Sequence, residues 1–138
     1  MVSTLASKIS LLVAVAALGG CVSADMSLDG KAPQAVRAGR PTPMEQSFLT
    51  LDKNCRPKAR PSAVVTRPPG HGSVRPVTRT SEAIYGPGPY RHCNGKLAPA
   101  LAFEYRSKPD YRGPDSFDVR VRYSDGELRP ASYAVDVW

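Results

Sequence analysis

The residues best suited to covalent or metal chemistry are the cysteines Cys21, Cys55 and Cys93 and the histidines His71 and His92. Thiolates act as nucleophiles and metal ligands, and imidazoles transfer protons or bind metals. Metal sites are usually recognised by short ligand spacings such as C-x₂-C or H-x₃-H, and the sequence contains neither. It also lacks a G-x-S-x-G elbow. We therefore expect turn or surface histidines and predict no catalytic residue, metal site or cofactor.

The first twenty residues have the composition of a targeting segment. Lys8 is followed by a stretch over 9–18 that is apolar except for Ser10. This stretch is too short to cross a bilayer, which takes about 20 apolar residues, but it suits the apolar region of a secretory signal. Residues 1–20 are interpreted as a signal peptide, to be removed from the mature protein.

The sequence Leu18-Gly19-Gly20-Cys21 ends this segment and resembles the bacterial lipobox. The resemblance implies that lipid is attached to the Cys21 thiol, that the chain is cleaved before it, and that acyl chains anchor the protein to a membrane. By analogy with known sorting patterns, Val22 in place of Asp favours the outer membrane. The alternative is an ordinary secretory signal with a chance cysteine. Either interpretation excludes nucleic acid as a partner, because the compartment is wrong.

Export bears directly on the remaining two cysteines. With Cys21 used for lipid, Cys55 and Cys93 are left as a pair, and an even number of thiols in a small exported domain favours a disulfide. In the chain-entropy account, closing a loop of this length contributes about 4 kcal/mol. Free thiols or metal ligands are the alternatives.

Charge and aromatic residues supply the candidates for partner binding. The net charge is +7, and the segment from Lys53 to Ser81 contains seven basic residues and no acidic one. Such a stretch attracts anionic polymer or lipid head groups; the alternative is a solvated basic surface. Tyr and Arg are enriched at binding hot spots, and loops commonly carry recognition. The candidate partner-binding residues are Tyr90, Arg91, Arg67, Arg75 and Arg79, whereas Tyr105 and Tyr111 are expected to be core or corner tyrosines.

The 14 prolines and 11 glycines disfavour long helices and suit a β fold with many turns. Residues 21–44 are predicted to form the lipidated N-terminus and a flexible tether, and residues 45–138 a single domain. Short apolar segments between turn signals predict strands. These are residues 47–51, 62–66, 73–79, 101–106, 116–123 and 131–138, with a short strand around 83–85. Pro76 indicates an edge strand, and Asp125-Gly126 predicts a tight hairpin between the last two strands.

Residues 60–138 carry a second resemblance. Tyr105, the sequence Y-R-G-P-D-S-F over 111–117 and the closing Asp125-Gly126 hairpin resemble the C-terminal half of bacterial Ig-like, cadherin-like repeats, and P-G-H-G-S-V over 69–74 is similar to their P-x-x-G-x-V turn. The resemblance implies an all-β fold, a single Ig-like antiparallel β-sandwich of about seven strands. Gly113 is expected in a turn, Asp115 as an acceptor of backbone N–H groups and Phe117 in the core. Acidic residues that would link repeats through calcium are sparse.

These features predict a membrane-anchored envelope lipoprotein with a non-catalytic Ig-like domain that binds a protein or an anionic envelope polymer such as lipopolysaccharide. One alternative is an accessory structural subunit of an envelope complex, which would co-purify with one stoichiometric partner. Another is a small metal-dependent or hydrolytic enzyme, whose activity would depend on His71 or His92.

Overall fold

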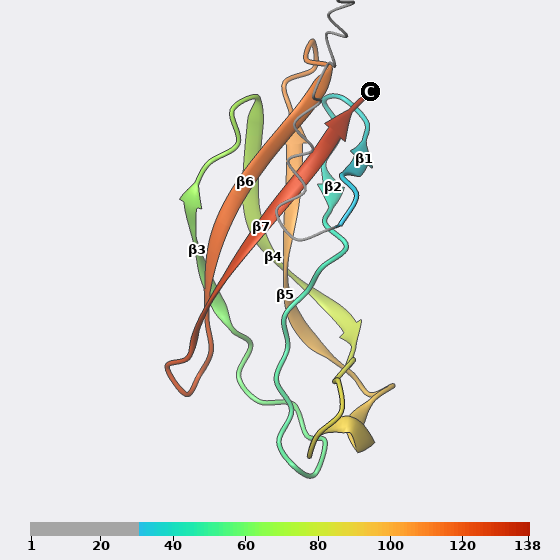
Figure 1. The fold of residues 1–138 in the computed structure, drawn as a ribbon, viewed down its shortest axis with the longest axis vertical. Helices are drawn as coiled ribbons and strands as arrows, with labels where there is room; N and C mark the ends of the chain where they lie inside the picture. The colour runs from blue at the N-terminus through green and yellow to red at the C-terminus, as the bar shows by residue number, and fades with distance from the viewer. Residues whose placement is uncertain (1–30) are drawn as a thin grey trace, which may run out of the picture.

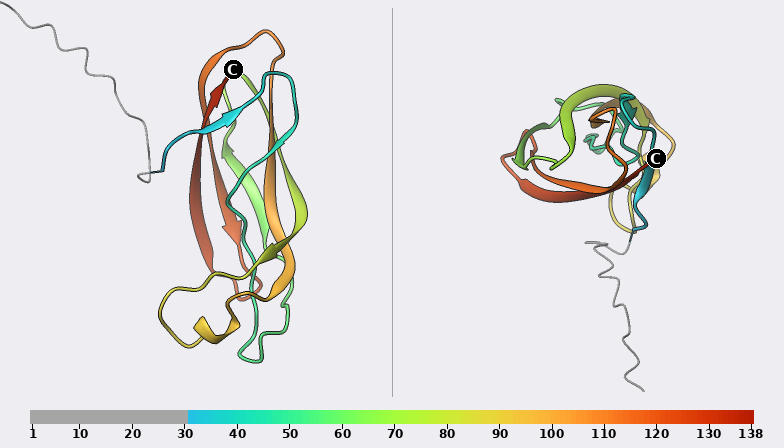
Figure 2. Two further views of the ribbon diagram at one scale, coloured as in Figure 1. Left: turned by 90° about the vertical axis from the view of Figure 1, so that its right-hand side faces the viewer. Right: turned by 90° about the horizontal axis from the view of Figure 1, so that it is seen from above.

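The computed structural model describes residues 31–138; the predicted signal peptide and Cys21 lie outside the described residues. Two β-sheets pack face to face (Figures 1 and 2), with strand orders β1-β7-β6-β3 and β2-β5-β4. The strands are β1 Gln34–Val36, β2 Thr42–Pro43, β3 Ser62–Arg67, β4 Gly72–Glu82, β5 Leu97–Ser107, β6 Gly113–Arg122 and β7 Leu128–Val137, with one 3₁₀ turn, η1 Arg91–Cys93. The predicted all-β sandwich of seven strands is confirmed. Within residues 31–138 no helix has the length and hydropathy of a membrane span.

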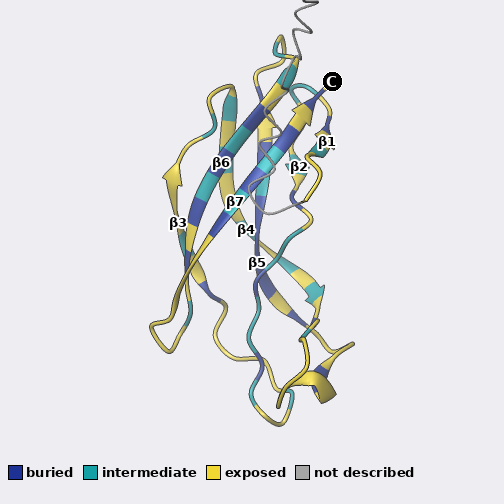
Figure 3. Ribbon diagram, viewed as in Figure 1, coloured by how far each residue is buried: buried dark blue, intermediate teal, exposed yellow. Residues whose placement is uncertain are grey.

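The core lies between the sheets and follows the alternation seen in the sequence (Figure 3). Leu101, Phe103 and Tyr105 of β5 are at most 1% exposed. The ring of Phe117 on β6 stacks on Tyr133 of β7 at 4.7 Å between centroids and meets Phe103 edge-on at 6.4 Å. Because apolar side chains alternate along β6 and β7, one face of these strands belongs to the core and the other carries charged residues.

The predicted hairpin is confirmed. β6 and β7 pair antiparallel from Gly113↔Val137 to Arg122↔Leu128, and Gly126 adopts a φ of +89° in the turn. A positive φ is strained for residues with a Cβ but not for glycine, which explains the position of Gly126.

Each sheet has a long strand with one side largely unpaired, β4 in one sheet and β7 in the other, and each of these strands contains a proline. β4 pairs only with β5, which confirms the edge position predicted from Pro76. β7 has β1 as its second neighbour only over its last three residues, from Val135 to Val137, and carries Pro130 beyond that contact. A proline has no N–H to complete a ladder, so these edges are poor templates for an added strand.

The predicted tether is wrong over its second half. β1 and β2 fall inside residues 21–44, and Val36 and Met44 are 2% and 0% exposed, so the described domain begins at least as early as Gln34. β1 also runs parallel to β7, whereas an antiparallel sandwich was expected. The sequence does not indicate these strands, because two or three residues are too few to show a period of two. Gly39 and Pro41, which lie between them, are also typical of a linker.

Two other predicted strands are absent from the described residues. Residues 47–51 make only isolated bridges, Phe48↔Leu101 and Leu51↔Pro57, and residues 83–85 form no strand because β4 ends at Glu82. Phe48 and Leu51 are nonetheless buried. Their apolar character therefore reflects packing against the core rather than membership of a sheet.

Candidate functional site

The predicted disulfide between Cys55 and Cys93 is confirmed, with the two Cα atoms 5.2 Å apart. It joins the loop after residue 51 to η1, at the lower end of the molecule in Figure 1. We call residues 52–60 and 90–96 the disulfide end. Cys93 is fully buried, whereas Cys55 is partly exposed.

The loop that carries Cys55 is a compact turn. One carboxylate oxygen of Asp52 accepts hydrogen bonds from the backbone N–H groups of Asn54 and Arg56, at 2.8 and 2.9 Å. The bond from the Arg56 N–H is the main reason that the pKa of Asp52 lies below its usual value. Cys55 has a φ of +59°, a left-handed conformation that is unusual outside glycine. The thiol position is therefore defined by the turn as well as by the disulfide.

The disulfide end is strongly basic. Asp52 is its only acidic residue, and its six basic side chains are all exposed: Lys53, Arg56, Lys58, Arg60, Arg91 and Lys96. The three ion pairs among residues 31–138 involve none of these six. Tyr90 is 39% exposed and its ring lies 5.5 Å from that of Tyr85. Of the predicted partner-binding residues, Tyr90 and Arg91 thus belong to this basic surface.

The other three predicted partner-binding residues do not gather there. The Arg67 guanidinium binds both carboxylate oxygens of Asp118, at 2.7 and 3.1 Å, which lowers the pKa of Asp118. Arg75 pairs with Glu104 across the β4–β5 ladder at 2.7 Å. Both cations are therefore partly neutralised by their carboxylate partners. The distribution of charge along the sequence does not reveal this pairing, because each partner lies far along the chain.

Arg79 has a structural role in the fold. Its guanidinium donates hydrogen bonds to the carbonyl oxygens of Met44 at 3.0 Å and Glu45 at 2.5 Å, and to the Ser81 hydroxyl at 3.2 Å. These bonds attach the segment after β2 to the edge strand β4. Removing the guanidinium would therefore weaken this attachment, whatever its effect on the binding of a partner.

The opposite end of the sandwich is organised around Asp115. Its carboxylate accepts hydrogen bonds from the Tyr105 hydroxyl at 2.7 Å and from the backbone N–H groups of Gly70, His71 and Ser116 at 2.9 to 3.0 Å. Burial alone would raise the pKa of Asp115, but these four donors outweigh burial and lower it. The expectation that Asp115 accepts backbone N–H groups is confirmed. That its partners come from both sheets could not be predicted from local sequence patterns.

The two histidines lie far apart in the fold and in different surroundings. His71 stacks on Tyr111 at the Asp115 end, with 3.8 Å between ring centroids. His92 Nε2 lies at the disulfide end, 2.9 Å from the Lys53 carbonyl oxygen and 3.6 Å from Cys93 Sγ. A joint site made of both histidines is therefore excluded. Instead, Cys55, His92 and Cys93 form a group whose ligand atoms lie within 4.8 Å of one another.

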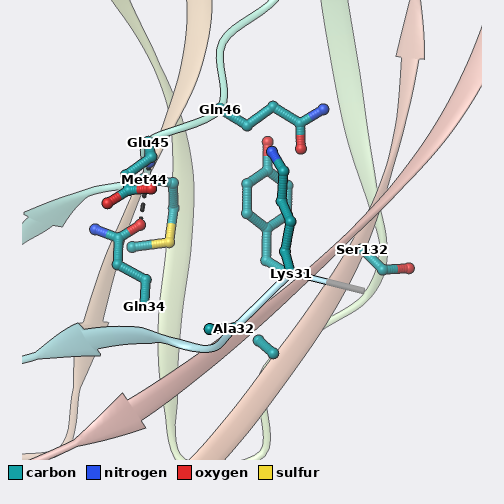
Figure 4. Close-up of a pocket in the computed structure, with 9 residues that line it drawn as sticks. Lys31, Ala32, Gln34, Met44, Glu45, Gln46 and Ser132 are labelled. Carbon is teal, nitrogen blue, oxygen red and sulfur yellow. Dashed lines mark hydrogen bonds between the residues drawn. The ribbon is translucent and has the colours of Figure 1, made fainter. Parts of the chain in front are cut away.

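A trough runs beside the open edge of β7. It consists of two cavities of about 240 and 590 Å³ that share Lys31, Glu45 and Gln46. Figure 4 shows the smaller one, where polar side chains surround Met44 and Gln34 accepts a hydrogen bond from the Glu45 N–H. The larger one has a more polar lining but includes Ile84, which is 86% exposed. The trough was not anticipated from the sequence, because its walls come from four separate segments.

Tyr133 also lines the smaller cavity. Its hydroxyl is buried and has no hydrogen-bond partner among residues 31–138, and burial raises its pKa. A buried hydroxyl without a partner is energetically unfavourable. The Tyr133 hydroxyl is therefore expected to lower the stability of the fold.

Comparison with known proteins gives no matching family model, no similar curated protein and no similar solved structure. The class of protein is therefore defined by the strands themselves: a disulfide-linked β-sandwich with one strongly basic end.

Proposed function

We propose that this protein is a lipid-anchored envelope protein whose non-catalytic, Ig-like β-sandwich binds an anionic envelope component at its disulfide end. The observation that carries the proposal is the set of six exposed basic side chains on two loops that a disulfide holds together. None of them takes part in an ion pair among residues 31–138, and the single acidic residue of this end, Asp52, offsets only part of their charge.

Export and anchoring are supported by independent features of the chain. The apolar run and the Leu18-Gly19-Gly20-Cys21 sequence resemble a lipoprotein signal. The two other cysteines lie at bonding distance in the fold, as suits an oxidising compartment. Lipid on Cys21 would hold the domain near a membrane surface, where an anionic component is present at high local concentration.

The energetics favour this end over the rest of the surface. A Lys or Arg near an anionic surface contributes about 1 kcal/mol. Arg67 and Arg75 already share their charge with Asp118 and Glu104, which reduces what each can offer a ligand. Loops fixed by a cross-link also lose less conformational entropy on binding.

The test is binding of residues 22–138, exported behind a cleavable secretory signal, to purified lipopolysaccharide at low and high salt. Arg56→Gln with Arg91→Gln removes two cations from the disulfide end; Arg120→Gln with Arg122→Gln removes two exposed cations from β6 as a matched control. We expect the first pair to weaken binding about tenfold or more, the control pair to change it little, and salt to weaken it steeply. Equal effects of the two pairs, or binding insensitive to salt, would contradict the proposal.

A protein partner is a second candidate, favoured by the exposed Ile84 at the trough. A photo-crosslinking residue at position 84 is expected to capture one stoichiometric envelope protein in intact cells, and the same residue at position 120 is not. Equal capture at both positions would reject the trough as a specific interface.

A further inference from the structure

We propose that the Cys55–Cys93 disulfide masks a metal site: after reduction, the two thiolates and the His92 imidazole bind a borderline-soft divalent cation, zinc. This inference goes beyond the proposed function and does not rest on it. It concerns a group of side chains that short spacings in the sequence do not reveal, because Cys55 is far along the chain from His92 and Cys93.

One of the three ligand distances already suits a tetrahedral zinc ion, and all three ligand atoms lie within 4.8 Å of one another. With Zn–S near 2.3 Å and Zn–N near 2.0 to 2.1 Å, a tetrahedral site places a sulfur and a nitrogen ligand about 3.6 Å apart. His92 Nε2 lies 3.6 Å from Cys93 Sγ. The same geometry places the two sulfurs about 3.8 Å apart. The two sulfurs, now at bonding distance, are the ligand atoms that have to separate most, and rotation about the Cα–Cβ bond of the partly exposed Cys55 can supply this movement without opening the turn.

The arms of the site are held by contacts other than the disulfide. The Cys55 turn is closed by the Asp52 carboxylate and by a backbone hydrogen bond from the Cys55 N–H to the Asp52 carbonyl at 2.9 Å. On the other arm, the Asn94 side chain binds both the N–H and the carbonyl of Tyr85, at 2.6 and 3.1 Å. Cys93 is buried with Leu51, Ala83 and Ala98. We therefore expect the three ligands to remain close after reduction.

A second link between the two arms includes a ligand itself. His92 Nε2 hydrogen-bonds to the Lys53 carbonyl oxygen at 2.9 Å. This contact holds the imidazole over the Cys55 loop. When zinc binds, Nε2 gives up that hydrogen bond, its proton passes through solvent to Nδ1, and Nε2 coordinates the ion; a water molecule would take the fourth position.

The surroundings of the ligands are basic: Arg56 follows Cys55 in the chain, Arg91 lies two positions before Cys93, and both side chains are exposed. Metal binds the thiolate form of cysteine. Two thiolates and one Zn²⁺ also give a neutral centre, so the basic surroundings do not oppose the bound state.

The chemistry balances with a dithiol as reductant. One reductant thiolate attacks the Cys55 sulfur and breaks the S–S bond; the second then releases Cys55, and the reductant becomes a cyclic disulfide. Two electrons and two protons pass to Cys55 and Cys93. Zinc binding then replaces the two thiol protons, which go to solvent, so zinc affinity is expected to rise with pH.

The test uses residues 22–138 reduced with dithiothreitol, which is then removed by gel filtration without oxygen. Zn²⁺ is titrated in competition with a chromophoric chelator, and Co²⁺ is used as a spectroscopic probe. We expect one equivalent of tightly bound zinc only in the reduced protein, with a thiolate-to-cobalt charge-transfer band. His92→Gln keeps the disulfide pair intact and is expected to weaken zinc binding about tenfold or more, since one of three protein ligands is lost; His71→Gln, at the other end, is the matched control and is expected to have no effect.

Equal zinc affinity of the oxidised and reduced proteins, or equal effects of His92→Gln and His71→Gln, would overturn the proposal. If reduction unfolds the domain, zinc is expected to restore the circular dichroism of the oxidised protein in wild type and not in Cys55→Ser. A reduced, unfolded protein that zinc does not refold counts equally against a metal site.

Discussion

The two ends of the sandwich join the same two sheets by different chemistry. At the disulfide end a covalent bond links loops that otherwise bury only a small cluster of Leu51, Ala83, Cys93 and Ala98. At the other end the Asp115 carboxylate ties β6 to Tyr105 on β5 and to the connection between β3 and β4. One end therefore depends on the redox state of its surroundings and the other on pH. The covalent end can expose its polar and charged groups because its integrity does not require their burial.

The largest predicted effect is loss of the covalent link. Cys55→Ala with Cys93→Ala is expected to reduce the free energy of unfolding by about 4 kcal/mol, because the unfolded chain gains the conformational freedom of a long loop. Urea unfolding followed by tryptophan fluorescence and circular dichroism measures this. A loss below about 1 kcal/mol would show that the hydrogen bonds of the two loops suffice.

The pH-dependent link is expected to have the next largest effect. Asp115→Asn should reduce the free energy of unfolding by about 2 to 3 kcal/mol at pH 7, since hydrogen bonds to a charged acceptor are the strong ones. Asp110→Asn, which changes an exposed carboxylate nearby, is the control and should change it by less than about 0.5 kcal/mol.

The pKa of Asp115 fixes the direction of the pH dependence. The pKa of Asp115 is lower in the folded than in the unfolded protein. The contribution of its carboxylate to the free energy of unfolding is therefore complete above the unfolded pKa of about 3.9, and is lost as the pH falls toward the folded pKa. The stability difference between wild type and Asp115→Asn should therefore close in acid. A difference that stays constant from pH 7 to below pH 3 would contradict the assignment.

Two buried tyrosines allow a finer comparison. Tyr105→Phe removes the donor to Asp115 and is expected to lower the free energy of unfolding by about 1.5 to 2 kcal/mol. Tyr133→Phe removes a hydroxyl that has no partner within the described part of the chain, and should be neutral or slightly stabilising. Chemical denaturation of the two variants side by side decides this. Equal losses would mean that the Tyr133 hydroxyl has a partner in solution.

The smallest predicted effect concerns the outer face of the sheet. Arg67→Gln breaks the ion pair with Asp118, in which the Arg67 side chain is 45% exposed and the Asp118 side chain 30% exposed. Because the pair is exposed, its loss should lower the free energy of unfolding by less than about 1 kcal/mol. The loss should shrink further in high salt. A loss above 2 kcal/mol would show that Arg67 supports the strand itself.

The sequence predicts the fold well where the alternation of apolar residues is long. β5, β6 and β7 each have about ten residues, enough for a period of two to be read directly. β1 and β2, with three and two residues, carry no such signal. Their pairing depends on where Val36 and Met44 fall against distant strands, which local patterns do not encode.

The candidate site is less predictable than the fold for a related reason. The disulfide follows from counting cysteines, but the availability of each cation depends on partners far along the chain. Arg67 is paired with Asp118, and Arg79 with the carbonyls of Met44 and Glu45. His92 approaches Cys55 only because the disulfide end brings the two loops together. These are tertiary contacts between exposed loops, for which sequence periodicity gives no signal.

The most direct test of this account is the intact mass of the protein from the membrane fraction, with free thiols alkylated at the moment of lysis. We expect a chain that begins at Cys21, carries acyl lipid on that residue and holds Cys55 and Cys93 in an unalkylated disulfide. A full-length, unlipidated chain in the soluble fraction with Cys55 and Cys93 both alkylated would contradict it.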